Sequence, residues 1–181
     1  IGDFSLFDYE HGIVGVGEIG SRVVAWARSA GMEVLANDPP KAAAGVQGLV
    51  SLAEIAEKSD IITFHPTLNS DGPYKSYHLA DDLFFASLGR CKLLINASRG
   101  AVVDNNALLR AIEAASVGCA AVDVWENEPD INISLLNKVY IATPHIAGYS
   151  AEGTMNATSM VLNAFAKYIN YKGELPQLSL A

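Results

Sequence analysis

Polar residues of chemically useful types lie in or just after apolar stretches in the C-terminal half of the sequence. Arg99 follows CKLLINAS, Asp123 lies within CAAVDVW, Glu128 follows that stretch, and His145 follows VYIATP. A histidine can transfer a proton, a carboxylate can orient it, and an arginine can hold an anion supplied by a ligand. Each residue alone is more often structural, but the combination is what hydride transfer from a 2-hydroxy acid requires.

Glycines near the N-terminus indicate where a dinucleotide would bind. Gly15, Gly17 and Gly20 form G-x-G-x-x-G directly after the apolar stretch HGIV, and Asp38 follows the last glycine by 38 − 20 = 18 residues. Such glycines permit a tight turn and a close approach of the backbone to a pyrophosphate at a helix N-terminus. A carboxylate at Asp38 accepts hydrogen bonds from the ribose 2′-hydroxyl, so the pattern favours NAD over NADP.

A regular alternation of segments must position these residues. Strands are expected at 11–17, 32–38, 60–65, 91–98, 119–125 and 139–145. Helices are expected at 18–31, 51–60, 80–88, 104–115 and 150–170. Ser51 with Glu54, and Asp104, are expected to cap two helices, and DPP at 38–40 is expected to form a turn. Short apolar strands between helices indicate an α/β fold with a doubly wound parallel sheet, a Rossmann-type dinucleotide-binding domain.

Composition excludes several classes of function. The 181 residues are 50% hydrophobic and 18% charged, with a net charge of −8, and no Lys/Arg cluster occurs. Nucleic acid and anionic membranes are therefore poor partners, whereas a small anionic ligand needs only a local positive site. No apolar run is long enough to span a membrane, and a cytoplasmic protein is expected. Cys91 and Cys119 are expected to be reduced, and no metal site is expected.

The stretches GIVGVGEIG, INASRGAVVD, DVWENEP and TPHIAGYS resemble those of the D-2-hydroxyacid dehydrogenases over roughly residues 5 to 170. The intervals 128 − 99 = 29 and 145 − 128 = 17 fit the Arg, Glu, His triad of that family. NDPPK, DGPYKSYHLAD, RGAVVDN and DVWENEP are most similar to the branch that oxidises 4-phosphoerythronate in pyridoxal phosphate biosynthesis.

The resemblance implies a role for each catalytic residue. Arg99 would bind the carboxylate and C2 oxygen of the substrate, so its anion arrives with the ligand. His145 would take the 2-hydroxyl proton while hydride leaves C2 for the nicotinamide. Glu128 would hold the imidazole and stabilise its protonated form.

Other residues are expected to contact the cofactor. Asp123 would hydrogen-bond the nicotinamide carboxamide, and Ile19 and Gly148 would help to wall the cofactor. FHPTL departs from the family pattern because Pro66 precedes the threonine, which leaves His65 and Pro66 as wall candidates or as a structural loop. His11 and His78 receive no function. The full expected cofactor set is Gly15, Gly17, Ile19, Gly20, Asp38, His65, Pro66, Ser98, Asp123 and Gly148.

Three functions compete at this point. The first is oxidation of 4-phosphoerythronate to its 2-oxo acid with NAD. The second keeps the chemistry but changes the acid, for example to 3-phosphoglycerate. The third is a non-catalytic, dinucleotide-sensing corepressor of the same fold. A formate dehydrogenase fits less well, because that subfamily places a glutamine where Glu128 stands.

The resemblance also implies that the chain is part of a larger enzyme. Residues 1–170 would be the NAD-binding domain, and residues 171–181 would begin a C-terminal segment leading to further domains. Those domains would supply part of the substrate site and a dimer interface, so a homodimer is expected at full length. The 181 residues alone are expected to bind NADH and to show little or no oxidation of hydroxy acids, because cleft closure needs the second domain.

Overall fold

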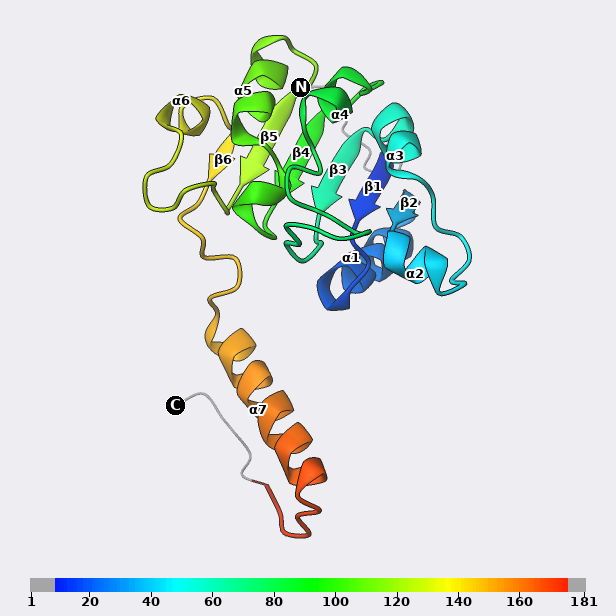
Figure 1. Cartoon of the computed structure of the whole chain (residues 1–181), viewed down its shortest axis with the longest axis vertical. Coiled ribbons are helices and arrows are strands. Elements are labelled where there is room, and N and C mark those ends of the chain that lie inside the picture. Colours follow the sequence, from blue (N-terminus) through cyan, green and yellow to red (C-terminus); the bar gives the residue numbers. More distant parts are fainter. Residues whose placement is uncertain (1–8, 176–181) are drawn as a thin grey trace. The chain divides into compact units, whose positions relative to one another are not determined.

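The structure is a computed structural model that describes residues 9–175. The chain divides between Pro144 and His145 into two compact units. The first unit contains a six-stranded parallel sheet, in the order β2-β1-β3-β4-β5-β6 (Figure 1). The strands are β1 (Glu10–Val14), β2 (Glu33–Asn37), β3 (Ile61–Phe64), β4 (Leu93–Asn96), β5 (Cys119–Val122) and β6 (Ile141–Ala142). The expected α/β fold with a doubly wound sheet is confirmed.

Short helices connect the strands of the first unit. They are α1 (Glu18–Ser29), α2 (Pro39–Ala43), α3 (Leu52–Lys58), α4 (Asp82–Ala86), α5 (Asn105–Glu113) and α6 (Ile133–Leu136), and a 3₁₀ turn spans Gly100–Val102. The second unit contains α7 (Ala151–Tyr168), whose N-terminus is capped by Ser150. No described helix is both long and apolar enough to cross a membrane.

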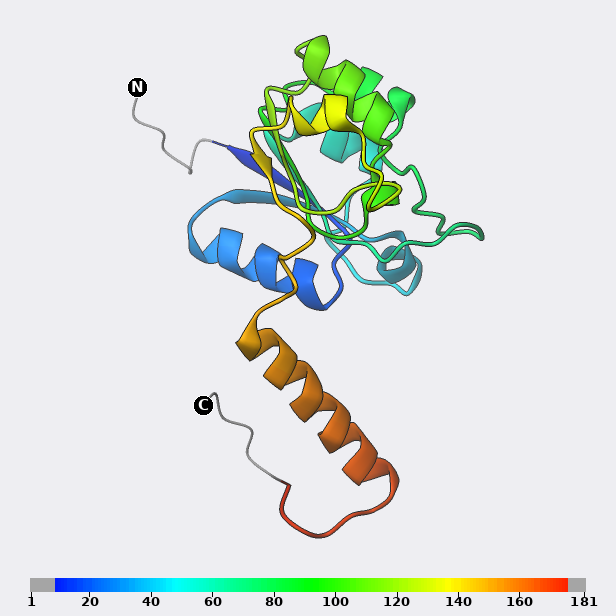
Figure 2. The same cartoon turned by 90° about the vertical axis from the view of Figure 1, so that its left-hand side faces the viewer.

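The sheet separates two apolar clusters of unequal size. Along β1, Val14 belongs to the large cluster, which includes residues of α3, α4 and α5, whereas Ile13 packs with Val24 of α1 and Ala36 of β2. The sides alternate because successive side chains of a strand point to opposite faces. Figure 2 shows α1 on one face of the sheet and α5 on the other.

The order of the strands reverses direction beside β1. The chain passes from β1 to β2 on one side and then returns to β3 on the other side of β1. In open parallel sheets a crevice forms at such a point, outside the carboxyl ends of the strands. The glycine-rich turn after β1 and Asp38 after β2 both lie at this crevice.

Two expected helix caps are confirmed and one expected turn differs. The Ser51 hydroxyl accepts the backbone N–H of Glu54, and Asp104 accepts two N–H groups of α5. The residues DPP start helix α2 instead of closing a simple turn, because Asp38 caps the helix and proline is favourable in a first turn. Cys91 and Cys119 are free thiols, and burial raises the pKa of Cys91 to about 12, so that thiol is unreactive.

His11 of β1 is a buried histidine on the sheet. Its side chain is 6% exposed, and within the described part of the chain neither ring nitrogen has a hydrogen-bond partner. Burial, assisted by the nearby His65, lowers the pKa of His11 from 6.5 to about 4. His11 is therefore neutral in the folded protein at pH values where the unfolded chain is protonated.

This burial predicts an acid-sensitive stability. The pKa of His11 is lower in the folded protein than in the unfolded chain. The contribution of neutral His11 to the free energy of unfolding is therefore fully present above pH 6.5 and is lost as the pH decreases toward 4. The loss between pH 7 and pH 5 is expected to be about 2 kcal/mol from His11. Urea unfolding across this range measures it, and His11→Leu should flatten the profile. His65, whose pKa is also lowered by burial, contributes a slope of the same sign that remains in this variant. An unchanged profile in His11→Leu would contradict the assignment.

Candidate cofactor and active site

The glycines after β1 form a turn that packs tightly except at one position. Gly15 has φ +85°, and a Cβ there would lie 2.5 Å from the backbone nitrogen of Pro66. A Cβ at Gly20 would lie 1.9 Å from the carbonyl oxygen of Gly15. A Cβ at Gly17, which caps α1 without a side-chain bond, would meet no atom within 4 Å. The chain's own packing therefore explains two of the glycines, whereas Gly17 leaves open space at the helix N-terminus.

Asp38 connects the end of β2 to this turn. Its Oδ2 accepts the N–H of Val16 at 2.9 Å, and its Oδ1 accepts the N–H of Lys41 at 3.0 Å. The ammonium of Lys41 donates to the Val16 carbonyl at 2.5 Å. Each carboxylate oxygen has two lone pairs, so Asp38 can still accept hydroxyl groups from a ligand.

A pocket of about 250 Å³ lies at the same edge of the sheet. Gly15, Gly17 and Asp38 line it together with His65 and Pro66, which follow β3. Its surface is mostly apolar, which suits a flat aromatic group, and the carboxylate of Asp38 is among its polar lining groups. Burial lowers the pKa of His65, whose Nε2 lies 3.0 Å from the hydroxyl of Thr63.

Arg99 lies between the end of β4 and the 3₁₀ turn at Gly100–Val102. Its Nη1 donates to the carbonyl of Ser98 at 2.7 Å, which fixes one side of the guanidinium. The amide of Asn96 donates to the Arg99 carbonyl at 3.1 Å and accepts the Ser98 hydroxyl at 2.9 Å. Sequence reasoning missed Asn96, although a polar residue at the end of an apolar strand is a usable signal. Ser98, expected at the cofactor, hydrogen-bonds to Asn96 and Arg99 within this turn.

Asp123 and Glu128 follow β5 on one connected segment. Asp123 accepts the hydroxyl of Thr143, and Glu128 Oε1 accepts the N–H of Trp125 at 2.7 Å. The indole of Trp125 donates to the Thr143 carbonyl at 3.0 Å. These bonds hold both carboxylates at the carboxyl edge of the sheet, next to the segment that bears Arg99.

The remaining expected site residues lie on two units. Ile19, in the first turn of α1, is 61% exposed. His145 and Gly148 belong to the second unit, and His145 has φ +55°. Arg99 and Glu128 belong to the first unit, so their juxtaposition with His145 stays a prediction.

Comparison with known proteins decides the family. Residues 3–147 match the family model described as D-isomer specific 2-hydroxyacid dehydrogenase, NAD binding domain. The chain belongs to this family. Erythronate-4-phosphate dehydrogenase of Escherichia coli is 48% identical over 170 residues, which are 93% of this chain and 45% of that protein. The protein of that name from Bacteroides thetaiotaomicron is 52% identical over 160 residues, which are 88% of this chain and 46% of that protein.

Solved structures agree with the family. D-lactate dehydrogenase of Aquifex aeolicus, in complex with NAD and lactic acid, aligns with a TM-score of 0.72 and 28% identity, covering 91% of this chain and 55% of that one. An acyclic imino acid reductase in complex with NADPH and D-Arg aligns with a TM-score of 0.78 and 27% identity, covering 93% and 53%. This chain thus spans less than half the length of the curated relatives and about half of these structures.

The cofactor of this D-2-hydroxyacid dehydrogenase domain is NAD. The residues present fit it, because the open space at Gly17 admits a pyrophosphate that a Cβ would obstruct. Gly15 and Gly17 would hold the pyrophosphate, and Asp38 would hold the adenosine ribose beside the apolar pocket. NAD supplies the hydride acceptor when it is bound.

This arrangement predicts that one glycine substitution affects NADH binding and another affects the stability of the fold. Gly17→Ala is expected to weaken NADH binding at least about tenfold, with little change in the free energy of unfolding, because the added methyl obstructs only the ligand. Gly20→Ala is expected to destabilise the fold by about 1–3 kcal/mol, because its methyl overlaps the Gly15 carbonyl. Fluorescence titration with NADH and urea unfolding separate the two. Wild-type affinity in Gly17→Ala would show that the pyrophosphate does not approach this turn.

Proposed function

We propose that the protein oxidises 4-phosphoerythronate to its 2-oxo acid, with NAD as hydride acceptor, in pyridoxal phosphate biosynthesis. The observation that supports this substrate is the identity of 48% and 52% to proteins named erythronate-4-phosphate dehydrogenase. Because the chain spans less than half of those proteins, the activity is proposed for the protein at its full natural length. A cytoplasmic homodimer is part of the proposal.

Three side chains would perform the chemistry on the substrate. The guanidinium of Arg99, fixed on one side by the Ser98 carbonyl, keeps donors for the substrate carboxylate and C2 oxygen. His145 accepts the 2-hydroxyl proton as the C2–H bond breaks and its electron pair leaves with the hydride. Glu128 stabilises the resulting imidazolium. The products are the 2-oxo acid, NADH and one proton.

Asp38 supports a preference for NAD over NADP. A 2′-phosphate would bring negative charge beside this carboxylate, whereas a 2′-hydroxyl can donate to it. The ammonium of Lys41 is bound to the Val16 carbonyl and lies close enough to the turn to lessen this discrimination. Parallel titrations with NADH and NADPH measure the balance, and equal affinity would reject the preference.

The experiment for the proposed function is a panel of initial rates with the full natural-length protein. 4-Phosphoerythronate, 3-phosphoglycerate, D-lactate and glycolate would each be supplied with NAD and with NADP. The proposal expects the highest kcat/KM for 4-phosphoerythronate with NAD. A higher kcat/KM for 3-phosphoglycerate would identify that acid as the substrate instead of 4-phosphoerythronate. NADH binding without oxidation of any acid would favour the sensing role.

A further inference from the structure

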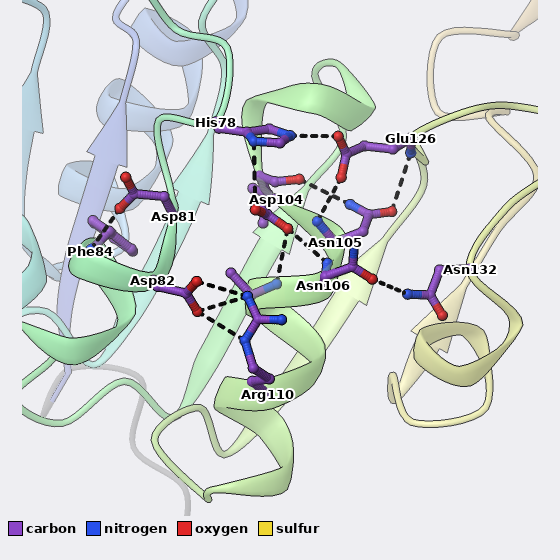
Figure 3. A network of polar contacts seen from close by, with 12 residues as sticks. His78, Asp81, Asp82, Phe84, Asp104, Asn105, Asn106, Arg110, Glu126 and Asn132 are labelled. Carbon is purple, nitrogen blue, oxygen red and sulfur yellow. Dashed lines mark hydrogen bonds and ion pairs between the residues drawn. The ribbon is translucent and has the colours of Figure 1, made fainter.

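His78 joins three segments that lie beside the proposed substrate site. It ends the loop that follows β3, has φ +50°, and stacks on Tyr77 with ring centroids 4.0 Å apart. Figure 3 shows its imidazole between two carboxylates. Its Nε2 lies 2.6 Å from Glu126 Oε1, and its Nδ1 lies 3.5 Å from Asp104 Oδ2. A non-glycine residue rarely adopts a positive φ, so the backbone conformation of His78 indicates that the surrounding contacts hold it in place.

The second oxygen of each carboxylate is already engaged. Asp104 Oδ1 accepts the N–H groups of Asn106 and Ala107 and so caps α5. Glu126 Oε2 accepts the N–H of Asn105 at 2.7 Å, and the N–H of Glu126 donates to Asn105 Oδ1 at 3.2 Å. Both carboxylates are therefore anchored by backbone groups, so the imidazole meets fixed partners.

The backbone around His78 holds the segment that follows Arg99. The N–H of His78 donates to the carbonyl of Ala101 at 2.7 Å, and the N–H of Ala80 donates to that of Val102 at 3.1 Å. The N–H of Val102 in turn donates to the Arg99 carbonyl at 3.1 Å. Residues 78–80 thus pair with the 3₁₀ turn that begins directly after Arg99.

The opposite side of this turn rests on the segment that bears Glu128. A Cβ at Gly100 would lie 2.0 Å from the carbonyl oxygen of Trp125, so the two backbones are in direct contact. Trp125 donates its N–H to Glu128, and Glu126 contacts His78. The turn after Arg99 is therefore enclosed between residues 78–80 and residues 125–126.

We propose that His78 is a positioning residue that sets the separation of Arg99 and Glu128. Its imidazole binds Glu126 on the Glu128 segment and Asp104 at the end of the Arg99 turn. The Glu126–Asn105 hydrogen bonds and the contact at Gly100 would still join the two segments after loss of the imidazole, so we expect a shift in their separation that weakens binding of the substrate carboxylate by Arg99. This inference rests on the proposed function, since it assumes that Arg99 and Glu128 serve one substrate.

A divalent cation is a weaker interpretation of the same three side chains. Their ligand atoms lie within 4.8 Å of one another. The two ring nitrogens of His78, however, face different carboxylates, and Nε2 is at hydrogen-bond distance from Glu126. A cation would have to replace the hydrogen bond between His78 Nε2 and Glu126, so the structure favours a hydrogen-bonding role for His78 over metal binding.

Three variants of the full natural-length protein test the proposal. His78→Phe keeps a ring to stack on Tyr77 and removes both polar contacts. His78→Gln keeps an N–H donor for Glu126. Arg110→Ala is the matched control, because Arg110 of α5 forms a two-point ion pair with Asp82 of α4 in the same region (Figure 3).

The readouts are the KM for 4-phosphoerythronate, kcat, the Kd for NADH, and hydrogen exchange at the Val102 amide. His78→Phe is expected to raise KM and the exchange rate about tenfold each, with kcat changing less than KM and the Kd for NADH unchanged. His78→Gln should recover most of both losses, and Arg110→Ala should show neither.

The outcomes separate this proposal from the proposed function. Unchanged exchange at Val102 in His78→Phe overturns the tie whatever the activity. Faster exchange with an unchanged KM, or an equal effect in Arg110→Ala, overturns the positioning role. An increase in Kd for NADH that matches the increase in KM also overturns it, because it indicates general destabilisation. If the wild type does not oxidise 4-phosphoerythronate, the proposed function fails, and the positioning role fails with it.

Discussion

Replacing His145 by alanine is expected to lower kcat by about 10²- to 10⁴-fold and to leave the Kd for NADH nearly unchanged. The reason is that the proposed role is proton transfer from the 2-hydroxyl, and the groups that would hold the pyrophosphate and the adenosine ribose lie after β1 and β2. Stopped-flow oxidation and NADH titration on one preparation measure both quantities.

The matched control for His145→Ala is His11→Leu, which changes a buried histidine of β1 outside the proposed site. It should alter stability at low pH and leave kcat near the wild-type value. A loss of NADH affinity in His145→Ala, with kcat preserved at saturating cofactor, would show that His145 supports the fold or the cofactor instead of the proton.

Arg99→Lys is expected to weaken transition-state binding by about 2–4 kcal/mol, which lowers kcat/KM roughly 30- to 1000-fold. The Ser98 carbonyl already takes one edge of the guanidinium, and the remaining donors can bind two oxygens of the substrate. A lysine provides one compact ammonium and cannot replace that geometry. Steady-state kinetics with 4-phosphoerythronate give the ratio.

Arg110→Lys provides the comparison for Arg99→Lys, because Arg110 also uses its guanidinium in a two-point pair, donating from Nε and Nη2 to the two oxygens of Asp82. That pair is exposed to solvent, so its loss should change kcat/KM and stability only slightly. A nearly normal kcat/KM in Arg99→Lys would remove Arg99 from the substrate site.

Local patterns in the sequence predict most of the sheet and the glycine turn after β1 that Asp38 contacts. Gly15, Gly20 and Asp38 could be recognised because turn geometry and a strand end leave a signature over a few residues. The separate behaviour of Gly17 could not be predicted, since it depends on which backbone atoms lie opposite each glycine.

The contacts around His78 show why other parts escaped prediction. His78 and Glu126 are 48 residues apart, and Asn105 and Glu126 are 21 apart, so no periodicity links them. The burial of His11 depends likewise on what packs over β1. The expected turn at 38–40 is instead the start of the helix Pro39–Ala43, because Asp-Pro-Pro suits both a turn and a capped helix start.

The most direct test of the central claim is hydride transfer from 4-phosphoerythronate deuterated at C2, with NAD and the protein at full natural length. The account predicts one deuterium in the NADH formed for each 2-oxo acid produced, and loss of this transfer in His145→Ala and Arg99→Lys. Binding of NAD without any transfer of deuterium from this acid would contradict it.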